Sequence, residues 1–228
     1  EWLWKKRVTS FKEMTSLSKQ MRDLFTIHFN INSIKIHKAE RSIDGTIKYS
    51  LQLQDKLLIE SVLIPSKKRL TACISSQVGC SLACGFCATG TLKLDRNLTT
   101  AEIYDQVFIL NEESISAFGK PLSNIVYMGM GEPLLNYNNM LKSIHFITSE
   151  QGLAMSPKRI TVSTAGIAKM IMKLADDGVK FNLAISLHTA NDEKRSKLMS
   201  LNDSVPLQDL RDAIRYFYDK TAGRITYE

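Results

Sequence analysis

The spacing of apolar residues along the chain changes from a helical to a strand-like period. In the first 30 residues, four apolar side chains recur at the spacing of one helix face: Leu17, Met21, Leu24 and Phe25. This period predicts a helical region over residues 1–30. Residues 34–65 alternate between apolar and polar positions and stop at Pro65, which predicts strands joined by a turn at residues 42–45. The two clearest strand segments are residues 46–54 and 57–65.

From Leu70 onward, apolar strand segments alternate with amphipathic helical segments. Five strands are expected, over residues 70–77, 124–130, 159–165, 181–188 and 224–228. The first three helices between them are expected to begin at Thr99, near Asn138 and near Ile167, and helical segments are expected to fill about residues 191–219. Thr99 and Glu102 have the spacing of a capping box, which marks a helix start. Strand–helix alternation predicts parallel strands with right-handed crossovers, in an open doubly wound sheet or in a full or partial (βα) barrel.

Four unusual segments stand at or just past the expected carboxyl ends of successive strands. These segments are Cys80–Cys87, Gly129–Pro133, Ser163–Gly166 and Ser186–His188. In both candidate architectures the functional groups gather at the carboxyl ends of the strands. We therefore expect these four segments to meet at one site.

Composition and charge are those of a globular protein with one basic half. The 228 residues are 44% hydrophobic and 23% charged, and no apolar run reaches the roughly 18–20 residues that cross a bilayer. We expect an accessory unit over residues 1–66 and a core over residues 67–228. Residues 1–100 carry 16 Lys and Arg against 8 Asp and Glu. This excess permits an anionic partner such as a nucleic acid, although, taken alone, it favours the plainer explanation of solvated surface lysines.

The densest basic patches, and the two chain ends, give further expectations. The patches are Lys5–Arg7, Lys35 with Lys38, and Lys67–Arg69. The chain has no initiator Met or signal peptide and ends within a strand pattern, so we expect a piece cut from a longer protein.

All four cysteines lie within residues 73–87, which indicates a metal or redox site in a reducing compartment rather than scattered disulfides. The cytoplasm is the expected location.

The cysteine segment has the spacing C-x3-C-x2-C, formed by Cys80, Cys84 and Cys87. Three thiolates this close can bind one inorganic centre. A cubane iron–sulfur cluster normally takes four cysteine ligands, so three would leave one iron open for another ligand. The alternative is a zinc ion whose fourth ligand is one of the four histidines: His28, His37, His145 or His188.

The amino-acid sequences of the four segments resemble those of a known family. The sequences "CISSQVGCSLACGFCATG", "VYMGMGEPLLNYNN", "ITVSTAG" and "LAISLHTANDEKR" resemble the RlmN/Cfr family of radical S-adenosylmethionine (SAM) RNA adenine methyltransferases. The resemblance runs from about Trp2 to Glu228. It implies an α/β fold, a partial (βα) radical SAM barrel preceded by a small helical and β accessory unit.

The resemblance also implies a set of site residues. Cys80, Cys84 and Cys87 are expected to bind a [4Fe–4S] cluster, with Phe86 shielding it from solvent or serving as a plain core aromatic. The residues expected to contact S-adenosylmethionine are Gly131, Glu132, Ser163, Ser186, Leu187 and His188. Gly131 and Glu132 would hold its methionine amino group, because glycine allows close backbone approach and a carboxylate pairs with an ammonium.

Two further residues are implied to act in catalysis. Cys73 matches a cysteine that resolves a covalent RNA–enzyme adduct and then forms a disulfide with a cysteine near the C-terminus. Glu60 matches a carboxylate proposed as the proton acceptor. The plain alternatives are a buried small hydrophobe for Cys73 and a solvent-facing carboxylate for Glu60. Which of the two takes the proton stays open.

The activity implied by the resemblance is methylation of C2 of an adenosine in 23S rRNA and in tRNA. In the family one SAM methylates a cysteine, and a second supplies the radical that activates this methyl group. The methyl-carrying cysteine is expected beyond Glu228, so the 228-residue chain alone is expected to be inactive. An external electron donor of the flavodoxin kind, a monomeric state and no membrane partner are also expected. The alternatives are C8 methylation, as in the Cfr branch, a noncatalytic zinc-bearing RNA-binding module, and a radical enzyme for a small metabolite.

Overall fold

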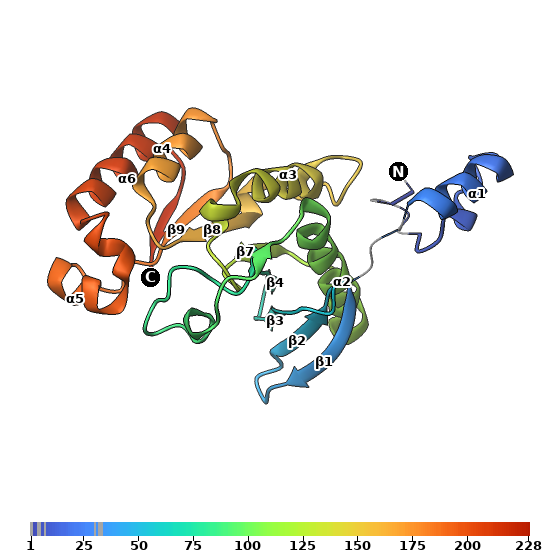
Figure 1. Ribbon diagram of the computed structural model, residues 1–228, viewed down its shortest axis with the longest axis horizontal. Helices are drawn as coiled ribbons and strands as arrows, with labels where there is room; N and C mark the ends of the chain where they lie inside the picture. Colours follow the sequence, from blue (N-terminus) through green and yellow to red (C-terminus); the bar gives the residue numbers. More distant parts are fainter. Residues whose placement is uncertain (1, 4–5, 7, 30, 32–33) are drawn as a thin grey trace.

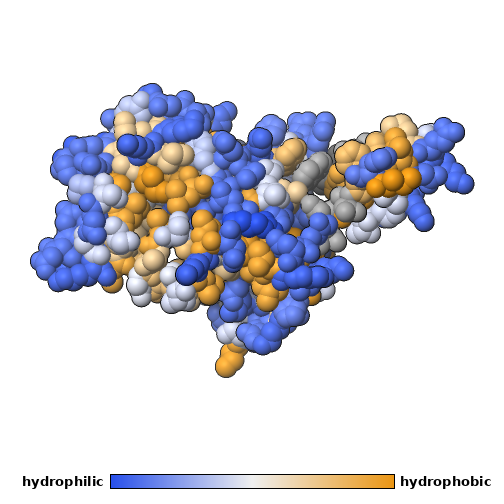
Figure 2. Space-filling view, in the orientation of Figure 1, coloured by the Kyte–Doolittle hydropathy of each residue, from blue (hydrophilic) through white to orange (hydrophobic). Residues whose placement is uncertain are grey.

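The computed structural model describes residues 2–3, 6, 8–29, 31 and 34–228. A short helical part at the N-terminus lies at one end of the molecule (Figure 1, Figure 2). The rest of the described chain forms an eight-stranded mixed sheet, a two-stranded ribbon and the helices that accompany them. None of the described helices is both long and apolar enough to span a lipid bilayer.

The N-terminal helical region is shorter than the sequence predicts. It contains a 3-10 turn, η1 (Phe11–Glu13), and one helix, α1 (Lys19–His28). Each begins at a serine, because Ser10 and Ser18 accept hydrogen bonds from the first backbone N–H groups of the element that follows. The prediction is thus confirmed for α1 and wrong for the segment before Ser18, where polar caps break the helical pattern. Residues 1, 4–5, 7 and 30 of the expected region lie outside the described residues.

One eight-stranded sheet contains both the accessory strands and the core strands. Its strand order is β1-β2-β3-β4-β7-β8-β9-β10. The first four strands pair antiparallel and have the bounds Lys35–Arg41, Ile47–Gln52, Leu58–Pro65 and Leu70–Cys73. From β4 onward the pairing is parallel, and β7 to β10 have the bounds Asn124–Tyr127, Ile160–Thr164, Asn182–Ile185 and Ile225–Tyr227. The expected boundary at residues 66–67 falls in the turn between β3 and β4, and the division into two units stays a prediction.

The helices that connect the parallel strands decide between the two architectures that the sequence left open. They are α2 (Thr100–Phe118), α3 (Tyr137–Thr148), α4 (Ala168–Asp176) and α6 (Leu207–Thr221). The strands β4, β7, β8, β9 and β10 follow each other in chain order across the sheet. Right-handed crossovers in a constant direction put all these helices on one face, as in a barrel, and not on both faces as in a doubly wound sheet. The structure therefore has the expected partial (βα) barrel.

The capping box expected at Thr99 is present and fixes the start of α2. The Thr99 side chain accepts from the Glu102 backbone N–H, and the Glu102 carboxylate accepts from the Thr99 N–H at 2.8 Å. The helical segments expected over about residues 191–219 are present as α5 (Asp192–Leu198), the 3-10 turn η5 (Ser200–Asp203) and α6, which follows Pro206.

The first core strand is shorter than expected, since β4 ends at Cys73 rather than at Gln77. Residues Gln77–Val78 form β5, which pairs with β6 (Arg96–Asn97) in a separate two-stranded ribbon. Between β4 and β5 the chain turns so that buried Ser75 and Gln77 make hydrogen bonds with neighbouring loops. Three further 3-10 turns complete the structure, η2 (Ala88–Thr91), η3 (Pro133–Asn136) and η4 (Pro157–Arg159).

Candidate functional site

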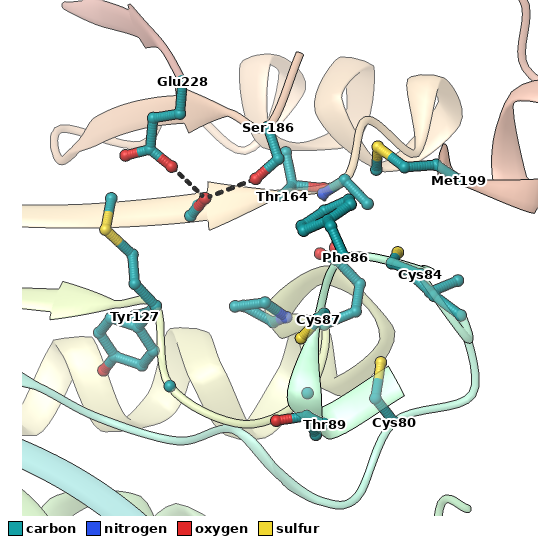
Figure 3. Close-up of a pocket in the computed structure, with 18 of the residues that line it drawn as sticks. Cys80, Cys84, Phe86, Cys87, Thr89, Tyr127, Thr164, Ser186, Met199 and Glu228 are labelled. Atoms are coloured by element: carbon teal, nitrogen blue, oxygen red, sulfur yellow. Dashed lines mark hydrogen bonds between the residues drawn. The ribbon is translucent and has the colours of Figure 1, made fainter. Parts of the chain in front are cut away.

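A cleft of about 270 Å³ opens at the carboxyl ends of the parallel strands. The cysteine loop and the segments after β7, β8 and β9 all line it, as does Glu228 after β10 (Figure 3). The four segments that the sequence predicts to share a site are therefore brought together. Their convergence follows from the parallel strands, whose carboxyl ends share one edge.

The cysteine loop presents three free thiols to the cleft, those of Cys80, Cys84 and Cys87. The loop folds closely on itself at Gly79 and Gly90. A Cβ atom at Gly79 would lie 1.9 Å from the carbonyl oxygen of Lys93, and one at Gly90 would lie 2.4 Å from that of Cys84. Only glycine fits at such backbone contacts, so these two residues determine the path of the loop.

The three thiols are close enough to affect each other electrostatically. Burial raises the pKa of Cys80 and of Cys84, and the neighbouring thiolates raise both further. Metal binding removes thiol protons, so a bound cation would relieve this unfavourable clustering. Within the described part of the chain, no three Cys, His, Asp or Glu side chains are placed to hold one metal ion. A cubane cluster does not require this, because its three cysteines bind three different irons, and the loop fits such a group.

Of the four histidines considered as a zinc ligand, His188 lines the cleft. Its ring packs against that of Phe86 in a tilted arrangement, with centroids 4.1 Å apart. Phe86 is 49% exposed, so it is not a core aromatic but covers the cleft beside two of the cysteines (Figure 3). This position agrees with the shielding role expected for Phe86.

Glu132 is a buried carboxylate that lines the same cleft and lies close enough to Cys80 and Cys84 to raise the pKa of both thiols. Its two oxygens accept hydrogen bonds from the backbone N–H groups of Ala165 at 2.7 Å and Leu134 at 2.9 Å. Burial raises its pKa to about 7, although these hydrogen bonds favour the charged form. Each oxygen keeps a further lone pair for a ligand. The group is therefore fixed in place and ready to meet a cation.

Gly131 allows the loop before Glu132 to pass closely over Gln77. Its φ is +92°, and a Cβ atom there would lie 2.4 Å from the Cβ of Gln77. The Gln77 side chain in turn accepts from the Glu132 backbone N–H at 2.8 Å. Gln77 and buried Ser75 were not among the predicted site residues, although consecutive polar residues at the end of an apolar strand were a visible signal.

Hydroxyl and carboxylate groups gather at the ends of β8, β9 and β10. The Ser163 hydroxyl lies 3.4 Å from that of Ser186 and donates to a Glu228 carboxylate oxygen at 3.5 Å (Figure 3). The Leu187 and His188 backbone N–H groups donate to the Glu228 carbonyl at 3.0 and 2.8 Å. Leu187 therefore contributes backbone rather than its side chain, which packs against the core. Glu228 was also missed, and its place at the end of the fifth strand was the available signal.

The two residues implied to act in catalysis are not among those that line this cleft. Cys73 ends β4 and is buried, which raises the pKa of its thiol to about 11. Glu60 lies on β3, where its half-exposed carboxylate pairs with Lys48 at 2.8 Å. Neither side chain lines the cleft, although the Cys73 thiol lies next to Met128 and within electrostatic range of Glu228, two residues that do line it. The alternative of a solvent-facing Glu60 describes its position here.

The disulfide expected for Cys73 is not supported. All four cysteines of the chain are described, and all four are free. Cys73 is buried in the sheet, on β4 between β3 and β7, while the other three thiols face the cleft, so fold geometry gives Cys73 no partner among them.

Comparison with known proteins identifies the family. Residues 74–226, about two-thirds of the chain, match the model of the radical SAM superfamily. The chain belongs to this superfamily. Membership implies a [4Fe–4S] cluster and S-adenosylmethionine, the two cofactors that the cysteine loop and the cleft predict.

Individual radical SAM relatives cover the whole chain. It is 58% identical over 228 residues to the probable dual-specificity RNA methyltransferase RlmN of Christiangramia forsetii, and covers 65% of that protein. It is 43% identical over 229 residues to the protein of the same name from Streptococcus mutans, and covers 63% of it. The expected resemblance is thus confirmed.

A solved structure of a radical SAM methyltransferase has the same fold as this chain. The crystal structure of a radical SAM methyltransferase from Sphaerobacter thermophilus matches 99% of this chain with a TM-score of 0.92 and 36% identity. The match covers 66% of that chain. The present chain therefore spans about two-thirds of the length of the relatives that it matches.

Proposed function

We propose that this chain is the cofactor-binding core of a radical SAM enzyme that methylates C2 of an adenosine in 23S rRNA and in tRNA. The observation that carries the proposal is the cleft itself, which three free thiols and a buried carboxylate line together. The RlmN relatives are named dual-specificity RNA methyltransferases, which supports RNA as the substrate class.

The cysteine loop would hold the cluster through Cys80, Cys84 and Cys87. With S-adenosylmethionine, such a cluster supplies a carbon radical for positions that ordinary methyl transfer does not reach. Phe86 and His188 cover the open side of the loop and would limit access of water and oxygen to it.

Polar groups on the other walls of the cleft would orient S-adenosylmethionine. Glu132 would pair with its ammonium group, because the carboxylate is fixed by two backbone N–H groups and faces the cleft. The hydroxyls of Ser163 and Ser186, with the Glu228 carboxylate, suit the ribose hydroxyls of the same ligand.

RNA would approach from the basic N-terminal half. Lys67, Lys68 and Arg69 are exposed in the turn between β3 and β4, and Lys35 and Lys38 are exposed on the edge strand β1. Such side chains bind phosphates without reading sequence. In the N-terminal patch, Lys5 and Arg7 lie outside the described residues. The target base must leave its stack to enter the cleft.

Several finer assignments complete the proposal. Cys73 would be the resolving thiol, and Glu60 would take a proton only if the loops around β3 rearrange. An external electron donor and action in the cytoplasm as a monomer are also proposed.

Anaerobic reconstitution with iron and sulfide tests the cofactor assignment. We expect a cluster bound by three cysteines and saturable binding of S-adenosylmethionine. A protein with one zinc ion and no labile sulfide would instead be the noncatalytic RNA-binding module.

The methylated position is tested by mass spectrometry of RNA treated with a form of the protein that extends past Glu228. This measurement distinguishes 2-methyladenosine from the 8-methyl product. If neither methylated adenosine forms and the enzyme instead turns over a small metabolite, the assignment of RNA as the substrate is refuted.

A further inference from the structure

Arg195 is the largest fully buried side chain of the described residues, with 0% of its surface exposed. It lies on α5 and reaches the ends of β8 and β9. Its guanidinium donates to four oxygens: those of Ala165 at 2.7 Å, Asn202 (Oδ1) at 2.8 Å, Leu187 at 3.3 Å and Ser186 at 3.3 Å. All four oxygens belong to neutral carbonyl or amide groups.

A buried guanidinium that binds neutral oxygens alone is energetically costly. Burial lowers the pKa of Arg195, and among the described residues the groups that act in the opposite direction are Asp192 and Cys84. The Asp192 carboxylate is exposed and already accepts from the Leu207 backbone N–H and from Asn202. Arg195 thus keeps a positive charge that no hydrogen-bonded anion neutralises.

The position of this charge is directly behind the cleft. Ala165 and Ser186, whose carbonyls bind the guanidinium, both line the cleft. Cys84 feels the charge of Arg195 electrostatically. The positive charge therefore lies behind the wall formed by Ala165 and Ser186, close enough to the Cys84 thiol to favour its thiolate form.

The segment that Arg195 anchors also holds the cysteine loop. The Gly85 backbone N–H donates to the Leu198 carbonyl at 2.9 Å, and the Ser200 hydroxyl donates to the Leu82 carbonyl at 3.3 Å. Met199, from the same segment, lines the cleft near Cys84 (Figure 3). The cysteine loop is thus hydrogen-bonded to the segment that directly follows Arg195 in the chain.

We propose that Arg195 is a positioning residue that acts as the built-in counter-charge of the iron–sulfur cluster. Three thiolates make the bound cluster anionic, and reduction adds a further negative charge. A fixed cation behind the loop favours the reduced form and raises the reduction potential. The inference rests on the cluster that the proposed function requires.

The measurement is the midpoint potential of the reconstituted cluster, from a redox titration followed by electron paramagnetic resonance. In Arg195→Gln the charge is lost and the carbonyl contacts are partly kept. We expect reduction to become at least tenfold less favourable, a shift of about 59 mV to lower potential for one electron. In Arg195→Lys the charge stays, and the equilibrium constant for reduction should remain within threefold of that of the unsubstituted protein, a shift of less than about 28 mV for one electron. The matched control is Arg211→Gln, because Arg211 is an exposed arginine on α6 and its loss should leave the potential unchanged.

A second variant keeps the test decisive if Arg195→Gln does not fold. Arg195→Met removes the charge and leaves an unbranched apolar side chain in the buried space, a kind of replacement that buried charged positions often tolerate. We expect the same downward shift. Iron and labile sulfide analysis distinguishes failure of the proposed function from failure of the counter-charge role. If the unsubstituted protein binds no cluster, both the proposed function and this inference are refuted. A cluster whose potential is the same in Arg195→Gln, or that shifts equally in Arg195→Lys, overturns the counter-charge role alone.

Discussion

Replacing Gly131 by alanine should damage the cofactor site more than the same change at another left-handed glycine. Gly131 has a φ of +92°, and Gly178, in the turn after α4, has a φ of +63°. A Cβ atom at Gly178 meets nothing within 4 Å, whereas one at Gly131 lies 2.4, 2.7 and 2.8 Å from the Cβ, Cγ and Oε1 of Gln77. The two glycines therefore share backbone strain but differ in the space around them.

The expected magnitudes follow from this difference. Alanine in a left-handed conformation costs about 1–2 kcal/mol, which is the whole effect expected at Gly178. At Gly131, forced overpacking adds about 1–3 kcal/mol, because Gln77 is 1% exposed and its Cβ has nowhere to move. The loop must shift and weaken the 2.8 Å hydrogen bond from Glu132 to Gln77. That bond is worth up to about 1.5 kcal/mol, and about 1.4 kcal/mol corresponds to a tenfold change in affinity.

Two assays check this reasoning. Urea unfolding of the cluster-free protein should show Gly131→Ala to be destabilised by roughly 2–5 kcal/mol, more than Gly178→Ala. Titration of the reconstituted protein with S-adenosylmethionine should show about tenfold weaker binding for Gly131→Ala and unchanged binding for Gly178→Ala. Equal losses of stability, or unaltered binding in Gly131→Ala, would refute the claim that close packing on Gln77 sets this loop.

Further predictions concern charge, packing and chain length. Because burial raises the pKa of Glu132 to about 7 from an ordinary value of 4.5, its contribution to the stability of the cofactor-free protein is fully present below pH 4.5 and lost as the pH rises through about 7. Affinity for the ammonium of S-adenosylmethionine should fall as the pH drops from 8 to 6, and calorimetry should find this dependence flattened in Glu132→Gln. Arg96→Met removes a bidentate partner of Glu102 and should cost roughly 1.5–3 kcal/mol in urea unfolding, against less than about 0.5 kcal/mol for Lys197→Met in an exposed pair. Phe86→Ala should speed the loss of cluster absorbance in air, and an unchanged rate would contradict shielding. The 228-residue chain with S-adenosylmethionine, reductant and RNA should yield no methylated adenine, and a clear product would disprove the need for a cysteine beyond it.

The sequence patterns predicted local structure correctly where a few neighbouring residues determine it. The capping box at Thr99 starts α2, and the cysteine spacing marks the loop that lines the cleft. Polar caps were underestimated in the N-terminal region, where Ser18 delays the helix. The same kind of error extended β4 to Gln77, because the apolar pattern does not show that Ser75 and Gln77 hydrogen-bond to other loops.

The sequence by itself determined the strand–helix order, the three clustered thiols and the four segments that meet at the strand ends. Tertiary structure decided what depends on residues distant in the chain. It placed the face of β3 that carries Glu60 toward solvent and Lys48, gave Glu228 a place beside Ser163, and buried Arg195 behind the cysteine loop. The physical reason is that burial and charge at a side chain depend on contacts made across the sheet, and local sequence patterns do not record these contacts.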